Sequence, residues 1–223
     1  DSRNADLAHR YYRLKAGWMG GETIDWWDRN APLPDDDDRS FTWDEAERLV
    51  LDSFAGFDPK MAELAESFFA RNWIDAAPRA GKSSGAFSHP VTPSAHPYIL
   101  MNYKPEVLND VFTLTHEAGH SMHSYYSSKT QSFEYYNYTI FVAEVASTFN
   151  EQLLSKYMME HAQDDRERAY LINRDIDAIR GTIIRQTMFA EFEKITHRMA
   201  EQGQPLTVQS FREVYGQLLK DYL

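Results

Sequence analysis

The sequence has 223 residues, of which 43% are hydrophobic and 14% aromatic, so the chain can bury a sizeable core and disorder of the whole chain is excluded. The 34 acidic residues outnumber the 23 Lys and Arg residues, and the resulting net charge of -11 argues against a nucleic acid partner. The chain has no cysteine and no apolar run approaching the roughly 20 residues of a membrane span, so we expect a soluble, cytoplasmic protein with no thiolate metal site, no disulfide and no membrane partner.

Helical spacing of apolar residues predicts a first helix over residues 7–19. Four consecutive aspartates at residues 35–38 favour an exposed loop, and they lack the alternating ligands and the glycine bend of a calcium loop. A capping box formed by Thr42 and Glu45 predicts the start of a second helix. Asp58, followed by a proline at the first helical position, predicts a third.

Residues 77–103 form the one good β region, because glycines and prolines interrupt any helical pattern there. Short strands are expected at 85–87 and 98–101. The other elements are helices, expected at about 107–126, at 140–159, at 164–202 with a loosening at Gly181, and from a cap at Thr207 to the end of the sequence. The predicted fold class is therefore mainly α with a small β-sheet.

The strongest chemical signal is the motif His-Glu-x-x-His, at His116, Glu117 and His120. On a helix, residues four apart lie one above the other, so both imidazoles can bind one metal ion from the same face. Glu117 is rotated about 100° from His116, which suits a general base better than a third ligand. By chance such a motif occurs in roughly 2% of chains of this composition. We therefore expect a catalytic metal site.

A catalytic zinc ion usually takes three protein ligands, and without cysteine the third must be His, Asp or Glu. Glu144, 24 residues after His120 on the next expected helix, is the candidate, because a carboxylate flanked by apolar residues is costly unless it is paired. His123 is the rival, but it lies too far along the helix axis to reach the same ion. We assign His123 to the cleft wall, with a core histidine as the equal alternative.

These residues lie within a series of sequence motifs that, in the same order along the chain, resemble the oligoendopeptidase F group of the thimet-oligopeptidase-like zinc peptidases. The resemblance is most specific between residues 81 and 151, and it is carried by Gly85-Ala86-Phe87, by residues 94–103, by the segment containing His116 to His123, and by residues 143–151. Two departures are visible: Ala118 stands where this group has a bulkier apolar residue, and the helical region before and the tyrosine-bearing segment after the resembling part are expected to be absent.

The resemblance implies a zincin-type catalytic region within a bowl-shaped helical oligopeptidase whose deep channel admits short, unstructured peptides. It implies one Zn²⁺ per chain, bound by His116, His120 and Glu144, and hydrolysis of internal peptide bonds. It also implies an edge strand beside the substrate, and the substrate-binding residues expected here are Gly85, Ala86, Phe87, His96 and His123.

The resemblance covers the chain as one piece of a catalytic domain. Within it we expect a helical part at residues 1–76, a β region with the substrate-edge strand at 77–103, the zinc-site helices at 104–163 and C-terminal helices at 164–223.

Glu117 is expected to take a proton from water and pass it to the departing amine, without a covalent intermediate. Ligand histidines normally donate their other ring hydrogen to an oxygen, and ligand carboxylates are hydrogen-bonded in turn. Ser147, Thr148 and Glu151 follow Glu144 at helical spacings of three, four and seven, so we expect them to support the ligands. Glu151 has a surface position as an equal alternative.

Two other functions stay open. A carboxypeptidase of related architecture would need a cation for the terminal carboxylate of its substrate, and Lys82 is the basic residue near the expected edge strand. A non-catalytic helical scaffold or peptide-binding module would have no use for Glu117 beside the first histidine. The sequence makes no prediction of oligomeric state or cleavage preference.

Overall fold

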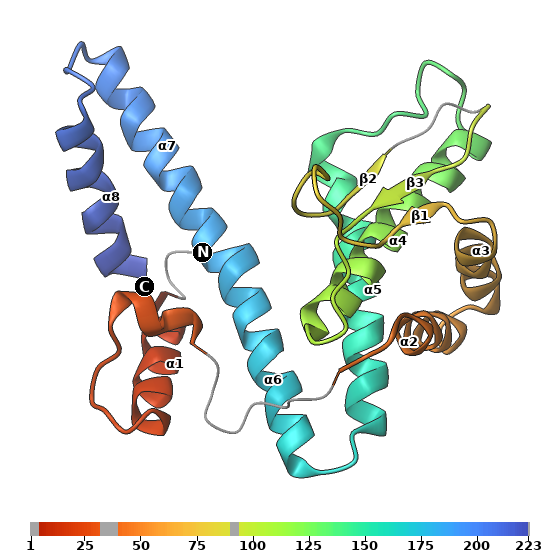
Figure 1. The fold of residues 1–223 in the computed structure, drawn as a ribbon. Helices are drawn as coiled ribbons and strands as arrows, with labels where there is room; N and C mark the ends of the chain where they lie inside the picture. The colour runs from red at the N-terminus through yellow and green to blue at the C-terminus, as the bar shows by residue number, and fades with distance from the viewer. Residues whose placement is uncertain (1–4, 32–39, 90–93, 223) are drawn as a thin grey trace. The chain divides into compact units, whose positions relative to one another are not determined.

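Helices dominate the computed structural model, which describes residues 5–31, 40–89 and 94–222 (Figure 1). They are α1 (Ala5–Trp18), the 3-10 helix η2 (Trp26–Asn30), α2 (Trp43–Ala55), α3 (Pro59–Ala70), α4 (Leu108–Thr130), α5 (Ile140–His161), α6 (Asp165–Ile179), the π-helical turn η3 (Arg180–Ile184), α7 (Arg185–Glu201) and α8 (Val208–Tyr222). One small sheet contains β1 (Ile74–Asp75), β2 (Phe87–His89) and β3 (Tyr98–Leu100). The prediction of a mainly helical fold with a small sheet is confirmed.

The described residues group into two compact units, one from residues 5–31 and 164–222 and the other from residues 40–89 and 94–163. The N-terminal helix α1 thus belongs to the same unit as the C-terminal helices. A buried cluster holds the first unit together, made of Ala8, Tyr11, Tyr12, Ile184, Met188, Leu218 and Tyr222. The interpretation of the chain as part of one catalytic domain stays a prediction.

Local signals fix the starts of several helices. The capping box is present at α2, where the Thr42 side chain accepts from the Glu45 amide and the Glu45 carboxylate accepts from the Thr42 amide. At α3 the Asp58 side chain accepts a hydrogen bond from the Lys60 amide and so caps the helix, and Pro59 lies at the first helical position. The expected loosening at Gly181 is a π-helical turn between α6 and α7. The aspartates at 35–38 lie outside the described residues.

The sheet has the strand order β1-β3-β2. β3 pairs in parallel with β1 and antiparallel with β2, with Ser88 opposite Ile99. β2 begins at Phe87, two residues later than the sequence predicts, because Gly85 adopts a φ of 83° in the preceding turn. β1 was not predicted, since two residues are too few to show a period. In the described sheet β2 is an edge strand.

Helix α4 packs between the sheet and α5 (Figure 1). Gly119, in the middle of α4, permits the close approach to α5: a Cβ atom placed there would lie 2.8 Å from the Cα atom of Ser147. This contact fixes the two helices that carry the candidate site. No helix among the described residues has both the length and the apolar character needed to cross a membrane.

Candidate active site

Three side chains from α4 and α5 converge on one point. Nε2 of His116 lies 3.1 Å from Nε2 of His120, and Oε2 of Glu144 lies 3.3 Å from the first nitrogen and 3.5 Å from the second. The two histidines occupy successive turns of α4, as their spacing of four residues predicts. The structure therefore brings together the three residues that the sequence singled out.

The triangle has the size that a tetrahedral zinc site requires. Ligand bonds of about 2.0–2.1 Å at tetrahedral angles put neighbouring donor atoms roughly 3.3 Å apart. Two imidazole nitrogens and one carboxylate oxygen are also the donor set of catalytic zinc sites, which leave a fourth position open. The donors of this chain thus fit such an ion.

Burial does not explain the position of Glu144 beside the two histidines, and its role as the third ligand stays a prediction. Its side chain is 59% exposed, and its apolar neighbours Phe141 and Val145 are exposed as well, so this turn of α5 is not a buried face. The carboxylate lies at the site because α5 crosses α4 at Gly119. The position of the Glu144 carboxylate therefore does not depend on burial of the neighbouring residues.

Two of the expected supporting residues contact the triangle. Oε1 of Glu151 lies 2.8 Å from Nδ1 of His116, on the side of the ring away from Glu144. A hydrogen on Nδ1 is thereby favoured, which leaves the lone pair of Nε2 directed at the other two donors. The Ser147 hydroxyl donates to Oε2 of Glu144 at 2.8 Å. These contacts hold the side chains in place before any ligand binds.

Glu117 lies beside the triangle and is buried, with 6% of its surface exposed. Its carboxylate accepts a hydrogen bond from the backbone amide of Ser88 on β2, whereas Oε2 has no hydrogen-bond partner among the described residues. Burial raises the pKa of Glu117, because the charged form loses its hydration, and His116 opposes this shift in part. The result is a carboxylate with enhanced basicity and one free oxygen.

The two histidines differ in their electrostatic surroundings. Burial works against protonation of His116, but the hydrogen bond to Glu151 and the nearby carboxylates outweigh it and raise its pKa. For His120 burial dominates and lowers the pKa, so its neutral form, the form that binds metals, is favoured.

A cavity of about 540 Å³ opens over these groups. Ala86, Phe87 and Ser88 line it from β2 and the preceding residue, so an extended backbone runs along one wall. The remaining lining residues are His116, Glu117, His120, Ser124, Asn137, Tyr138, Ile140, Ala143 and Glu144. The cavity therefore joins the edge of the sheet to the His-His-Glu triangle.

The model of peptidase family M3 matches residues 1–223. The chain belongs to peptidase family M3. It is 40% identical over 221 residues to oligopeptidase PepF of Bacillus subtilis (strain 168), which covers 99% of this chain and 33% of PepF. It is 37% identical over 222 residues to an oligoendopeptidase F homolog of Borreliella burgdorferi, covering 99% of this chain and 38% of that protein.

The solved structures agree with this membership. A crystal structure of a chain described as a peptidase from Chlamydophila abortus superposes with a TM-score of 0.82 at 34% identity, covering 99% of this chain and 37% of that one. The chain thus spans about one third of the length of the curated M3 relatives that it matches.

Apart from Ser147 and Glu151, which support the triangle from outside the cavity, four expected site residues do not line the cavity of this M3 chain. His96 stacks on Trp73 and lines a different cavity. The Thr148 hydroxyl donates to the backbone carbonyl of Glu144 instead of its carboxylate. Gly85 lies in the turn before β2, where its carbonyl accepts from Asn102. His123 stacks behind Tyr138 with ring centroids 3.7 Å apart, so it supports a wall residue.

The roles of three residues at the site were not predicted from the sequence. Ser88 acts through its backbone amide, which leaves no signal in the residue type. Tyr138, which lines the cavity, lies in a polar aromatic stretch that carried no assignment. Gly119 had a usable signal, because a glycine inside a helix costs about 1 kcal/mol relative to alanine and is retained where backbones approach closely.

Replacing Glu151 with alanine should weaken metal binding without abolishing it. The hydrogen bond that orients His116 would be lost, and loss of such a partner typically lowers metal affinity about 10- to 100-fold. Competition with a zinc chelator measures the change. Glu160→Ala, on an exposed turn of the same helix, is the matched control and should leave the affinity unaltered. Unchanged affinity in Glu151→Ala would assign Glu151 to the surface alone.

Proposed function

We propose that this chain carries the catalytic centre of a zinc-dependent endopeptidase that cleaves internal bonds of short, unstructured peptides. The observation that carries the proposal is the triangle of His116, His120 and Glu144 with the Glu117 carboxylate beside it. Membership of family M3 supports it, as do the oligopeptidase and oligoendopeptidase names of the relatives.

In this proposal His116, His120 and Glu144 hold one zinc ion per chain. The bound ion would polarise the carbonyl of the scissile bond and make water more acidic. Glu151 keeps the hydrogen of His116 on Nδ1, and Ser147 holds the Glu144 carboxylate toward the two imidazoles.

Glu117 would act as general base and then as general acid. It accepts a proton from the attacking water and delivers it to the amine of the departing fragment, so no covalent intermediate with the chain is needed. Burial makes the carboxylate a stronger base, and the Ser88 amide fixes one of its oxygens, while Oε2 is buried with no hydrogen-bond partner among the described residues.

The substrate would lie along β2. An extended peptide can add to the free edge of a strand through backbone hydrogen bonds, and Ala86 and Phe87 line the cavity at this edge. Unstructured peptides can adopt the extended form, whereas the backbone groups of folded proteins are already paired. On this basis the edge of β2 would favour short, unstructured peptides over folded proteins.

Elemental analysis of bound zinc tests the proposal. We expect one zinc per chain in the wild type and none in His116→Ala, with weakened binding in Glu144→Gln. His161→Ala is the control, because His161 lies in the last turn of α5 and bonds only its own helix. A folded wild-type chain that takes up no zinc when zinc is supplied, or a His116→Ala variant that keeps it, would contradict the assignment. Cleavage of a peptide blocked at both ends then separates an endopeptidase from a carboxypeptidase.

A further inference from the structure

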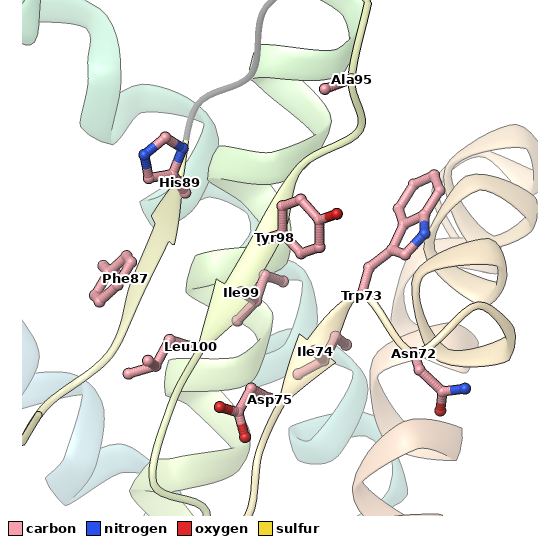
Figure 2. Close-up of a pocket in the computed structure, with 10 residues that line it drawn as sticks. All are labelled: Asn72, Trp73, Ile74, Asp75, Phe87, His89, Ala95, Tyr98, Ile99 and Leu100. Atoms are coloured by element: carbon pink, nitrogen blue, oxygen red, sulfur yellow. The ribbon is translucent and has the colours of Figure 1, made fainter. Parts of the chain in front are cut away.

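The sheet has a second cavity, of about 720 Å³, on the face that points away from α4 (Figure 2). The Ser88 hydroxyl contacts Ser121 of α4 and Ile99 is buried, so these alternate residues define the inner face. Because side chains alternate along a strand, Phe87 and Tyr98 lie on the outer face, where they are 46% and 53% exposed. The full lining is Asn72, Trp73, Ile74, Asp75, Phe87, His89, Ala95, Tyr98, Ile99 and Leu100.

The walls of this outer cavity are mostly apolar and aromatic. Its one carboxylate, on Asp75, is already bound by Arg79 through two contacts of 2.7 Å and by Lys82 at 3.1 Å. These cations hold the pKa of Asp75 well below its usual range. The outer cavity therefore presents no unpaired acid to a cation, and its surface suits an apolar group.

Two of the rings that line the outer cavity, Trp73 and Tyr98, pack against His96, which lies outside the lining. The imidazole of His96 lies 3.9 Å from the ring of Trp73 and 4.2 Å from that of Tyr98, measured between centroids. The three rings limit one another's rotation, so the surface is formed before a ligand arrives. Such preorganisation reduces the entropy lost on binding.

The outer cavity adjoins the candidate active site through one residue, because Phe87 lines both cavities. Ser88 of β2 and Glu117 line the same candidate-site cavity, so the free edge of β2 lies beside the general base. A peptide paired with this edge would alternate its side chains as β2 does. Every second side chain would thus lie on the outer face, with its Cβ atom about 4.5–5.5 Å from that of its neighbour on β2.

We propose that the outer cavity is a specificity subsite, which binds an apolar and preferably aromatic side chain of the peptide that pairs with β2. Phe87 contacts this side chain directly, and Tyr98 and Leu100 extend the surface beneath it. The inference rests on the proposed function only for the placement of the peptide; it requires neither the zinc ion nor the hydrolytic step.

The test is a positional scan read out as binding. A hexapeptide of Ala and Ser, acetylated and amidated, carries a single Phe that is moved from position to position, and its Kd for the Glu117→Gln chain is measured by calorimetry. We expect Phe to strengthen binding about tenfold at alternate positions through contacts with the outer cavity. The gain in affinity at these alternate positions should disappear in Phe87→Ala and in Tyr98→Ala. In Phe87→Leu most of this gain should be retained.

Trp27→Ala is the control, since Trp27 is exposed and lies outside the outer cavity. An equal loss at all positions, or a gain that survives both substitutions, would overturn the subsite. So would a dimer that Phe87→Ala dissociates, because the face would then belong to a second copy. If the wild type fails to hydrolyse any peptide but the alternating pattern persists, the proposed function fails and the subsite stands.

Discussion

Replacing Glu117 with glutamine should lower peptide hydrolysis about a hundredfold to ten-thousandfold while zinc content stays at one per chain. Glutamine has the size of glutamate and can still accept the Ser88 amide, but it cannot take a proton from water, and general acid-base catalysis contributes rate factors of this size. Stability should not fall, because the substitution removes a buried carboxylate with an unpaired oxygen. Turnover of a blocked peptide, zinc analysis and thermal unfolding measure the three effects.

Glu160→Gln provides the comparison, since it makes the same change on the exposed end of α5 and should leave all three measurements at wild-type values. If Glu117→Gln kept full activity, another group would have to serve as base. If it lost zinc together with activity, Glu117 would be acting as a ligand, and the separation of roles between Glu117 and the triangle would be incorrect.

Local chemistry made the helical parts of the fold predictable. The capping box at Thr42 and the Asp58-Pro59 start depend on neighbours within one turn, and both are present in the structure. The approach of the two imidazoles was equally predictable, because the geometry of a helix alone sets the spacing of His116 and His120. Such inferences need no knowledge of the tertiary structure.

Other features depend on pairing between distant segments. The grouping of α1 with α8 is fixed by contacts such as those of Tyr11 and Leu218, which no local pattern reveals. β1 exists because β3 supplies its partner, and the Ser88 amide reaches Glu117 because the sheet packs on α4. The residues of the candidate metal site could thus be predicted from the sequence. The strand that lines its cavity and the close contact between α4 and α5 could not.

Gly119→Ala should destabilise the chain and loosen the candidate metal site, even though alanine is the better helix former. The added Cβ atom would lie 2.6 Å from Nδ2 of Asn150, 2.8 Å from Cα of Ser147 and 3.0 Å from the Ala146 carbonyl oxygen. The last two are backbone atoms, which cannot rotate away, so α5 has to move. Overpacking of this kind costs about 1–3 kcal/mol, more than the roughly 1 kcal/mol gained from helix propensity.

The displacement would act on the metal site because Ser147 also holds the Glu144 carboxylate, three residues away on the same helix. We expect zinc affinity to fall about tenfold or more, as after loss of a group that orients a ligand. Gly216→Ala is the matched control: nothing lies within 4 Å of its Cβ position on α8, so it should raise stability by up to about 1 kcal/mol without affecting zinc. Equal gains in both variants would mean that α4 and α5 can separate freely, and that the triangle does not depend on the glycine between them.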